Sequence, residues 1–280
     1  MTKRLVFHFT ILSLAAFISF AAEEEENSRP IFADKNLEKT VRKFVFEKRD
    51  NDKPIVEEDV SSLSVVKGAG MEIADLSGME HCKSLASLDI PRNEVKDLSP
   101  LKNMDRLQFL NVAQNEIEDI SPLATIPALQ YIELSGNKVK DLGPLSGLTN
   151  LSALYLSTNE ITDISSITNL PKLSSLYLQN NKITSVEGLG NLHWLNSLSL
   201  ADNEIKDISG LRGLTNLYYL FLENNKIEDL GPLVEMCEAD KEKRFAPFLN
   251  LFLKGNPLSD EAKEKQIPRL KEIGVRVRES

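Results

Sequence analysis

One unit of 22 residues, repeated seven times without a gap over residues 85–238, constrains the fold of this chain more than any other feature. Asparagine marks the period. The marked positions are Asn93, Asn115, Asn137, Asn159, Asn181, Asn203 and Asn225, and Asn256 matches again after a longer interval. Seven further positions of each unit are Leu, Ile, Val or Met in every copy. A unit this short cannot bury its own apolar residues, so neighbouring units must stack and share one core.

Each unit combines one short strand with a return path. In residues 129–150, Leu129, Ile132 and Leu134 face inward while their neighbours face outward, because successive strand side chains point to opposite sides. An inward asparagine amide can satisfy backbone groups where the chain leaves the strand. The return segment Asp-Leu-Gly-Pro favours a single 3₁₀ turn over a long helix. The pattern predicts a solenoid with a parallel sheet on its concave face and short turns on its convex side.

The remaining segments are assigned from their composition. Lys3 and Arg4 precede an apolar run that is too short for a membrane span, which is typical of a secretion signal. The sequence predicts a signal peptide over 1–21, an acidic disordered leader over 22–30, a helical N-terminal cap over 31–62, a repeat array of about nine coils over 63–257 with an insertion at 234–247, and a C-terminal cap over 258–280.

Both ends of the array are predicted to be covered by helices. Asp34 is a favourable N-cap residue for the first of them. After the insertion, the last repeat strand is predicted to turn Phe248, Leu251 and Leu253 inward. A terminal helix follows, and Pro268 is expected to interrupt it.

Charge and side-chain chemistry exclude several functions. The formal net charge is −9, which argues against a nucleic-acid partner. Cys82 and Cys237 lie seven coils apart, so a disulfide between them is out of reach, and both are interpreted as core thiols. His81 and His193 are also far apart and suggest no catalytic pairing. Aspartates of the return paths are expected to accept backbone N–H groups rather than to bind calcium. We expect no enzyme activity, no cofactor and no metal.

Aromatic residues occupy many of the outward-facing positions of the strands. They provide either cross-strand packing or a contact surface, and tyrosine combines a rigid apolar ring with a hydroxyl, as contact hot spots do. Glu133, Gln179 and Glu223 belong to a polar fringe on the same face. Trp194 either extends the contact surface or covers Leu195. The predicted partner-binding set is Phe109, Tyr131, Glu133, Tyr155, Tyr177, Gln179, Trp194, Tyr219, Phe221 and Phe252.

The units resemble the 22-residue leucine-rich repeats of bacterial internalin-like proteins. One unit begins Leu107-Gln-Phe-Leu-Asn-Val-Ala-Gln-Asn-Glu-Ile, and residues 30–59 resemble the helical cap of that family. The resemblance covers roughly residues 30–257. It implies an arc or horseshoe whose concave strands bind a protein, which in internalins is a host surface receptor. The sequence shows no immunoglobulin-like domain after the repeats and no wall-sorting signal, so we transfer only the binding mode.

The leading hypothesis is an exported, non-enzymatic scaffold, secreted or held in the cell envelope, that binds a protein partner without a stable membrane anchor. A carbohydrate or envelope-glycan binder is the first alternative, because aromatic rings beside carboxamides also suit sugars. An intracellular regulatory subunit is the second, because 22-residue repeats also occur in phosphatase-regulating proteins of eukaryotes.

Overall fold

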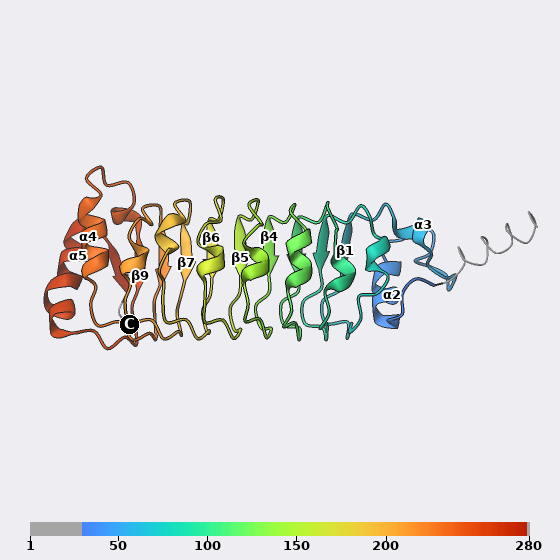
Figure 1. The fold of residues 1–280 in the computed structure, drawn as a ribbon, viewed down its shortest axis with the longest axis horizontal. Coiled ribbons are helices and arrows are strands. Elements are labelled where there is room, and N and C mark those ends of the chain that lie inside the picture. The colour runs from blue at the N-terminus through green and yellow to red at the C-terminus, as the bar shows by residue number, and fades with distance from the viewer. Residues whose placement is uncertain (1–29, 279–280) are drawn as a thin grey trace, which may run out of the picture.

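The chain forms an elongated stack of coils in the computed structural model, which describes residues 30–278 (Figure 1). One parallel sheet contains ten strands, β1 to β10, in the order of the sequence. The predicted leucine-rich repeat solenoid is therefore confirmed. The predicted signal peptide and nearly all of the acidic leader lie outside the described residues. Within the described part, no helix has the length and hydropathy needed to cross a bilayer.

Every strand is three residues long. The strands are β1 (Val65–Lys67), β2 (Ser87–Asp89), β3 (Phe109–Asn111), β4 (Tyr131–Glu133), β5 (Ala153–Tyr155), β6 (Ser175–Tyr177), β7 (Ser197–Ser199), β8 (Tyr219–Phe221), β9 (Asn250–Phe252) and β10 (Arg276–Arg278). From β1 to β8 the pairing register steps by one repeat, as in Leu110 opposite Ile132. The central residue of each strand from β1 to β9 is buried. Equivalent side chains therefore line up from coil to coil in straight columns.

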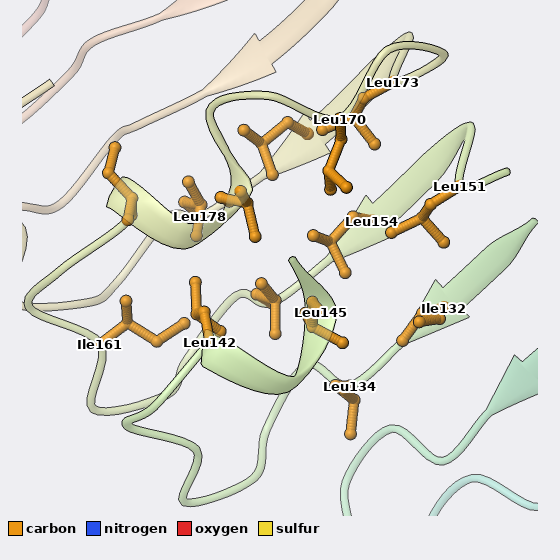
Figure 2. Close-up of a cluster of buried hydrophobic side chains, with 14 of the residues drawn as sticks. Ile132, Leu134, Leu142, Leu145, Leu151, Leu154, Ile161, Leu170, Leu173 and Leu178 are labelled. Atoms are coloured by element: carbon orange, nitrogen blue, oxygen red, sulfur yellow. The ribbon is translucent and has the colours of Figure 1, made fainter. Parts of the chain in front are cut away.

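The core lies between the strands and the return turns. Figure 2 shows leucines and isoleucines of successive coils converging there, and Leu145, Leu154 and Leu173 are fully buried. Burying one such side chain stabilises the fold by roughly 1.5–3 kcal/mol. Since each coil contributes the same seven apolar positions, the core is continuous along the array.

The chain leaves each strand through a left-handed residue that is followed by a ladder asparagine. Thr158 has a φ of 57°. Asn159 then donates to the carbonyls of Leu134 and Leu156, both at 3.0 Å, and accepts the Val139 N–H at 2.9 Å. The other left-handed residues in this position are Arg92, Gln114, Gly136, Asn180, Asp202, Asn224 and Gly255. Side chains other than glycine are strained there, and the asparagine bonds within the coil and to the preceding coil offset that strain.

The convex side is made of short turns. The 3₁₀ turns are Met79–His81, Ser99–Leu101, Ser121–Thr125, Gly143–Leu145, Ser165–Ile167, Leu189–Asn191, Ser209–Leu211 and Ala246–Phe248. An aspartate precedes most of them and accepts a backbone N–H two residues later, as Asp163 does from Ser165 at 2.8 Å. This confirms the interpretation of these aspartates as turn-forming residues.

Two short helices, α2 (Lys35–Arg42) and α3 (Glu57–Val60), precede the array. Asp34 caps α2 with one carboxylate oxygen and with the other accepts the N–H groups of Ala74 and Asp75 in the first coil. Burial raises the pKa of Asp34, but these four N–H donors outweigh burial and hold the pKa below its ordinary value. The cap is thereby bonded directly to the array.

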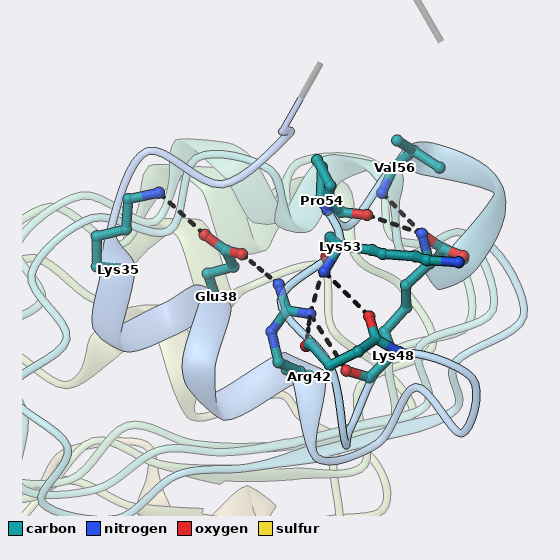
Figure 3. Close-up of polar contacts among 9 residues, drawn as sticks. Lys35, Glu38, Arg42, Lys48, Lys53, Pro54 and Val56 are labelled. Atoms are coloured by element: carbon teal, nitrogen blue, oxygen red, sulfur yellow. Dashed lines mark hydrogen bonds and ion pairs between the residues drawn. The ribbon is translucent and has the colours of Figure 1, made fainter. Parts of the chain in front are cut away.

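The loop between α2 and α3 is held by cationic side chains (Figure 3). Arg42 pairs with Glu38 and donates to the carbonyls of Lys48, Asn51 and Lys53. One guanidinium thus supplies hydrogen-bond donors to the backbone carbonyls of a segment that has no regular secondary structure.

The insertion after β8 forms helix α4 (Gly231–Ala239), which replaces the 3₁₀ turn of its coil. Asp240 then accepts the N–H groups of Arg244, Phe245 and Ala246 and reverses the chain. The prediction that Phe248 faces inward is wrong. Leu249 is fully buried instead, and Phe248 is 48% exposed, because the 3₁₀ turn ending at Phe248 shifts the register by one residue.

The C-terminal end contains helix α5 (Ile267–Ile273) and strand β10. Pro268 does not interrupt the terminal helix. It lies in the first turn of α5, directly after a π-helical segment at Ala262–Gln266. The helix continues through Pro268 because the wider π-helical turn before it accommodates a residue that lacks a backbone N–H. Gly274 ends α5 with a φ of 115°. The pairing of β10 with β9, Val277 opposite Leu251, was not anticipated from the sequence.

Both cysteines of the described chain are buried free thiols. Burial raises the pKa of Cys82 and of Cys237 to about 12 in each case. This agrees with the interpretation of both residues as core thiols.

Candidate partner-binding face

The concave face consists of the first and third side chains of each strand. The first column is Val65, Ser87, Phe109, Tyr131, Ala153, Ser175, Ser197, Tyr219, Asn250 and Arg276. The second column is Lys67, Asp89, Asn111, Glu133, Tyr155, Tyr177, Ser199, Phe221, Phe252 and Arg278. The predicted aromatic residues all lie in these two columns except Trp194.

The structure divides the aromatic residues into two stacks. In the first stack, ring centroids are 4.4 Å apart between Phe109 and Tyr131, and 5.3 Å apart between Tyr131 and Tyr155. Tyr177 ends this stack, 5.0 Å from Tyr155. The stack therefore crosses from the first column to the second between β4 and β5.

The second aromatic stack belongs to β8 and β9. Phe221 lies 6.2 Å from Tyr219 and 4.5 Å from Phe252, and both ring pairs are close to parallel. Aromatic pairs contribute about 0.5–1.5 kcal/mol beyond the area they bury. Stacking thus stabilises the sheet and also fixes the ring positions before any partner arrives.

The environment of the first stack disfavours ionisation of two of its tyrosines. Burial, together with Glu133, raises the pKa of Tyr131 to about 12. Burial also raises the pKa of Tyr155. The Tyr177 hydroxyl lies 2.8 Å from the Ser197 hydroxyl, on the next strand. Since stacked rings cover one another's faces, these hydroxyls and the ring edges are what the first stack offers to a partner.

An exposed aromatic rim lies just before strands β7, β8 and β9. It consists of Trp194, Tyr218 and Phe248, which are 70%, 51% and 48% exposed. Tyr218 and Phe248 meet edge to face, 6.5 Å apart. Sequence reasoning did not place Tyr218 or Phe248 in the site. The sequence does contain a signal for Tyr218, because the equivalent position of the other coils holds Ala, Gln, Ser or Asn. It contains none for Phe248, because the insertion before Phe248 interrupts the 22-residue period.

Polar residues of the face differ in their availability. Glu133 uses one oxygen to accept the N–H of Ser135, at 2.8 Å. Asn111 is bonded to Asp89 at 2.9 Å. Gln179 and Glu223 lie two residues beyond the ends of β6 and β8, next to the face, and their Oε1 and Oε2 atoms are shielded from solvent and have no hydrogen-bond donor. At the C-terminal end of the face, Arg276 and Arg278 are exposed, a basic end that the sequence analysis did not include.

The ladder asparagines form no part of this surface. Those from Asn93 to Asn225 are buried, and Asn256 is half-buried. Asn256 still makes the same bonds, donating to Leu222 and Leu253 and accepting from Ile227. The side-chain amides of these asparagines form hydrogen bonds with backbone groups, so the asparagines have a structural role.

Comparisons with known proteins agree with this geometry. The family model for Leucine Rich repeats (2 copies) matches overlapping windows at residues 127–169, 149–191, 171–208 and 193–235. No match was found among curated protein sequences.

Solved structures of bacterial repeat proteins are similar to this chain. An internalin (InlF) of Listeria monocytogenes is 27% identical with a TM-score of 0.73, over 89% of this chain and 76% of that one. Internalin C2 of the same organism is 24% identical with a TM-score of 0.63, over 89% of this chain and 95% of that one. A leucine-rich repeat protein of Leptospira interrogans is 22% identical with a TM-score of 0.68, over 79% and 62% of the two chains.

The ten-stranded parallel sheet, the asparagine ladder and the helical cap define a leucine-rich repeat solenoid. The chain is an internalin-like leucine-rich repeat protein. Such repeat domains generally act as scaffolds for protein interaction, and the internalin-like fold is typically non-enzymatic.

Proposed function

We propose that this protein is an exported, non-enzymatic scaffold that binds a protein partner through its concave face. The observation that carries the proposal is the aromatic surface made by the second stack and the rim, where Tyr219, Trp194 and Tyr218 are each about half exposed or more. Exposed large apolar side chains gathered in one place mark interaction sites. Fixed tyrosine rings lose little conformational freedom on binding, which favours affinity.

Replacing Tyr155, Tyr177 and Tyr219 together with alanine should weaken partner binding at least tenfold, because each ring lies on the concave face. The partner retained by the wild-type chain is first identified by affinity capture and mass spectrometry, and its affinity is then measured by calorimetry. Tyr219→Ala alone serves as a second variant, because Tyr219 is 48% exposed and lies outside the first stack.

Phe46→Ala is the matched control, since Phe46 is an exposed aromatic residue, 74% accessible, on the N-terminal cap. It should bind the partner as the wild-type chain does. Unchanged affinity of both tyrosine variants, with thermal midpoints close to that of the wild type, would exclude this face as the binding site.

A glycan ligand is the second candidate. Trp194 and Tyr218 are exposed enough for a sugar ring to stack on them. The first aromatic stack favours this function less, because its ring faces already contact one another. Screening the purified chain on a glycan array separates the two functions.

Export is the part of the proposal that depends on residues 1–21. Lys3 and Arg4 followed by an apolar run are typical of a cleaved signal peptide. We expect the protein recovered from its source to lack these residues and to reside outside the cytoplasm. Intact mass measurement decides the matter: a chain that still begins at Met1 would favour the intracellular regulatory alternative.

A further inference from the structure

The parallel sheet ends at β10 with an unpaired edge. At the other end of the sheet, the cap helix α2 packs against β1. Strand β10 pairs with β9 on one side, and no strand within residues 30–278 pairs with its other side. Arg276 donates its N–H toward the β9 side at 2.9 Å, and the Arg278 carbonyl accepts an N–H from that side at 3.0 Å. Because backbone groups alternate in direction along a strand, the N–H and the carbonyl of Val277 point to the open edge.

Two arginines project from this last strand onto the concave face. Arg276 and Arg278 are exposed, and neither forms an ion pair with a carboxylate in the described part of the chain. By contrast, Arg269 on α5 is neutralised by Glu238 and Glu272, at 2.7 and 3.0 Å. In a chain with a net charge of −9, this end of the concave face is therefore locally basic and open to an acidic ligand.

The residue between the two arginines is apolar. Val277 is half-buried and packs against the core, as does Ile273 at the end of α5. Arg276 and Arg278 lie two residues apart, which separates them by roughly 6.6 Å along the strand. Alternate residues of any second extended chain have the same spacing. Two acidic side chains of such a chain can therefore face the two arginines, while the residue between them lies beside Val277.

A second copy of this chain does not fit the edge. Pairing of β10 with another β10 would place arginines opposite arginines, and like charges directly opposite one another destabilise a sheet. The occupant must instead be acidic. The edge is also continuous with the proposed binding face, because Arg278 lies in register with Phe252, the last ring of the second aromatic stack.

We propose that β10 accepts an extended segment of the partner protein as an eleventh strand, with the pattern acidic, apolar, acidic. The two carboxylates of this segment pair with Arg276 and Arg278, and its backbone bonds the free N–H and carbonyl of Val277. Main-chain bonds supply affinity in such a strand addition, and the alternate side chains supply specificity. The inference rests on the proposed function and adds the chemistry of one segment of the partner.

The test uses the full chain and three pentapeptides, followed by NMR through the backbone amides of Arg276, Val277 and Arg278. The acidic peptide acetyl-Thr-Glu-Val-Glu-Thr-amide should shift these signals in a saturable manner that weakens with salt, and it should slow hydrogen exchange of the Val277 N–H. A peptide with glutamine in place of both glutamates should bind at least tenfold more weakly, because it lacks both charges.

The third peptide separates strand addition from simple charge attraction. It keeps both carboxylates but is N-methylated at its valine and at its second glutamate. These two methyl groups block the donor to the Val277 carbonyl in an antiparallel and in a parallel arrangement, respectively. This peptide should also bind at least tenfold more weakly than the acidic peptide.

Arg276→Gln combined with Arg278→Gln should weaken binding of the acidic peptide at least tenfold without lowering the thermal midpoint, since both side chains are exposed. Lys39→Gln combined with Lys43→Gln is the matched control, because it removes two exposed positive charges on the cap at the opposite end of the array. The control should leave the affinity unchanged.

Equal affinity for the acidic and glutamine peptides, equal affinity for the N-methylated peptide, or absence of shifts at residues 276–278 would overturn the proposal. Tighter binding of a peptide of residues 22–30, which contains four successive glutamates, would assign the edge to the leader of another copy and would also overturn it.

The two proposals fail separately. Partner binding that depends on Tyr219 but not on the two arginines refutes the added strand alone. Partner binding that is insensitive to the tyrosine substitutions refutes the binding face, whatever the peptides do.

Discussion

Asn159→Ala lowers the free energy of unfolding by about 3 kcal/mol, because three buried backbone groups each lose a hydrogen bond at once. These groups are the carbonyls of Leu134 and Leu156 and the N–H of Val139, each within 3.0 Å of the Asn159 amide. The Val139 N–H loses its side-chain acceptor, whereas the two carbonyls keep the amides of Asn137 and Asn181 as donors. The left-handed residue Thr158 also loses the bonds that hold its turn. Equilibrium urea unfolding followed by circular dichroism measures the change.

Asn216→Ala is the control for this substitution. The Asn216 side chain is exposed and makes one bond, to the His193 carbonyl at 2.7 Å. Its loss should change stability by no more than about 0.5 kcal/mol. Equal destabilisation by the two substitutions would contradict the structural role of the ladder. The slope of unfolding against urea concentration needs inspection as well, since repeat arrays can lose cooperativity.

Gly190→Ala should destabilise the protein by about 3 kcal/mol, because the added methyl group has no room between two coils. A Cβ at Gly190 would lie 2.0 Å from the carbonyl oxygen of Arg212 and 3.1 Å from its carbonyl carbon. Backbone atoms cannot turn away as a flexible side chain can, so the two convex turns must separate. The same unfolding experiment measures the loss.

Gly147→Ala makes the same chemical change where a Cβ meets nothing within 4 Å. There we expect no loss, or a gain of about 0.5 kcal/mol from reduced freedom of the unfolded chain. If both glycine variants unfolded at the same urea concentration, the close approach of the turns at Gly190 would not be a determinant of stability.

Periodicity explains why so much of the fold could be predicted. A side chain at a given position in one coil contacts the side chain at the same position in the next coil. An aliphatic residue that recurs at one position of every coil, such as Leu154, is therefore predicted to be buried and to pack against its equivalents in the neighbouring coils. The aspartate turns were predictable for the same reason, since a short acidic side chain bonds within its own loop. These features depend on contacts that repeat.

Features that do not repeat were missed. Phe248 was assigned to the core, but the added helix α4 and the turn after it shift the register, so Leu249 takes the buried place. Strand β10 carries no repeat signature and forms because α5 returns the chain to the edge of β9. The left-handed residues were also hidden, because positions such as Arg92 and Thr158 are not glycine.

The concave face shows the same division. The sequence placed Tyr155 and Tyr177 on one surface, but it could not show that their rings stack at 5.0 Å or that the row stops at β7. The unpartnered oxygens of Gln179 and Glu223 depend on where both side chains turn, which is decided by the residues of neighbouring coils.

The order of residues alone determined a stacked solenoid with a shared aliphatic core, a buried asparagine ladder and one sheet decorated with aromatic rings, because each of these follows from spacing along the chain. Tertiary structure alone decided which rings touch, which remain exposed and where acceptors lack donors. Those outcomes arise between coils, where side chains that are distant in sequence compete for the same space.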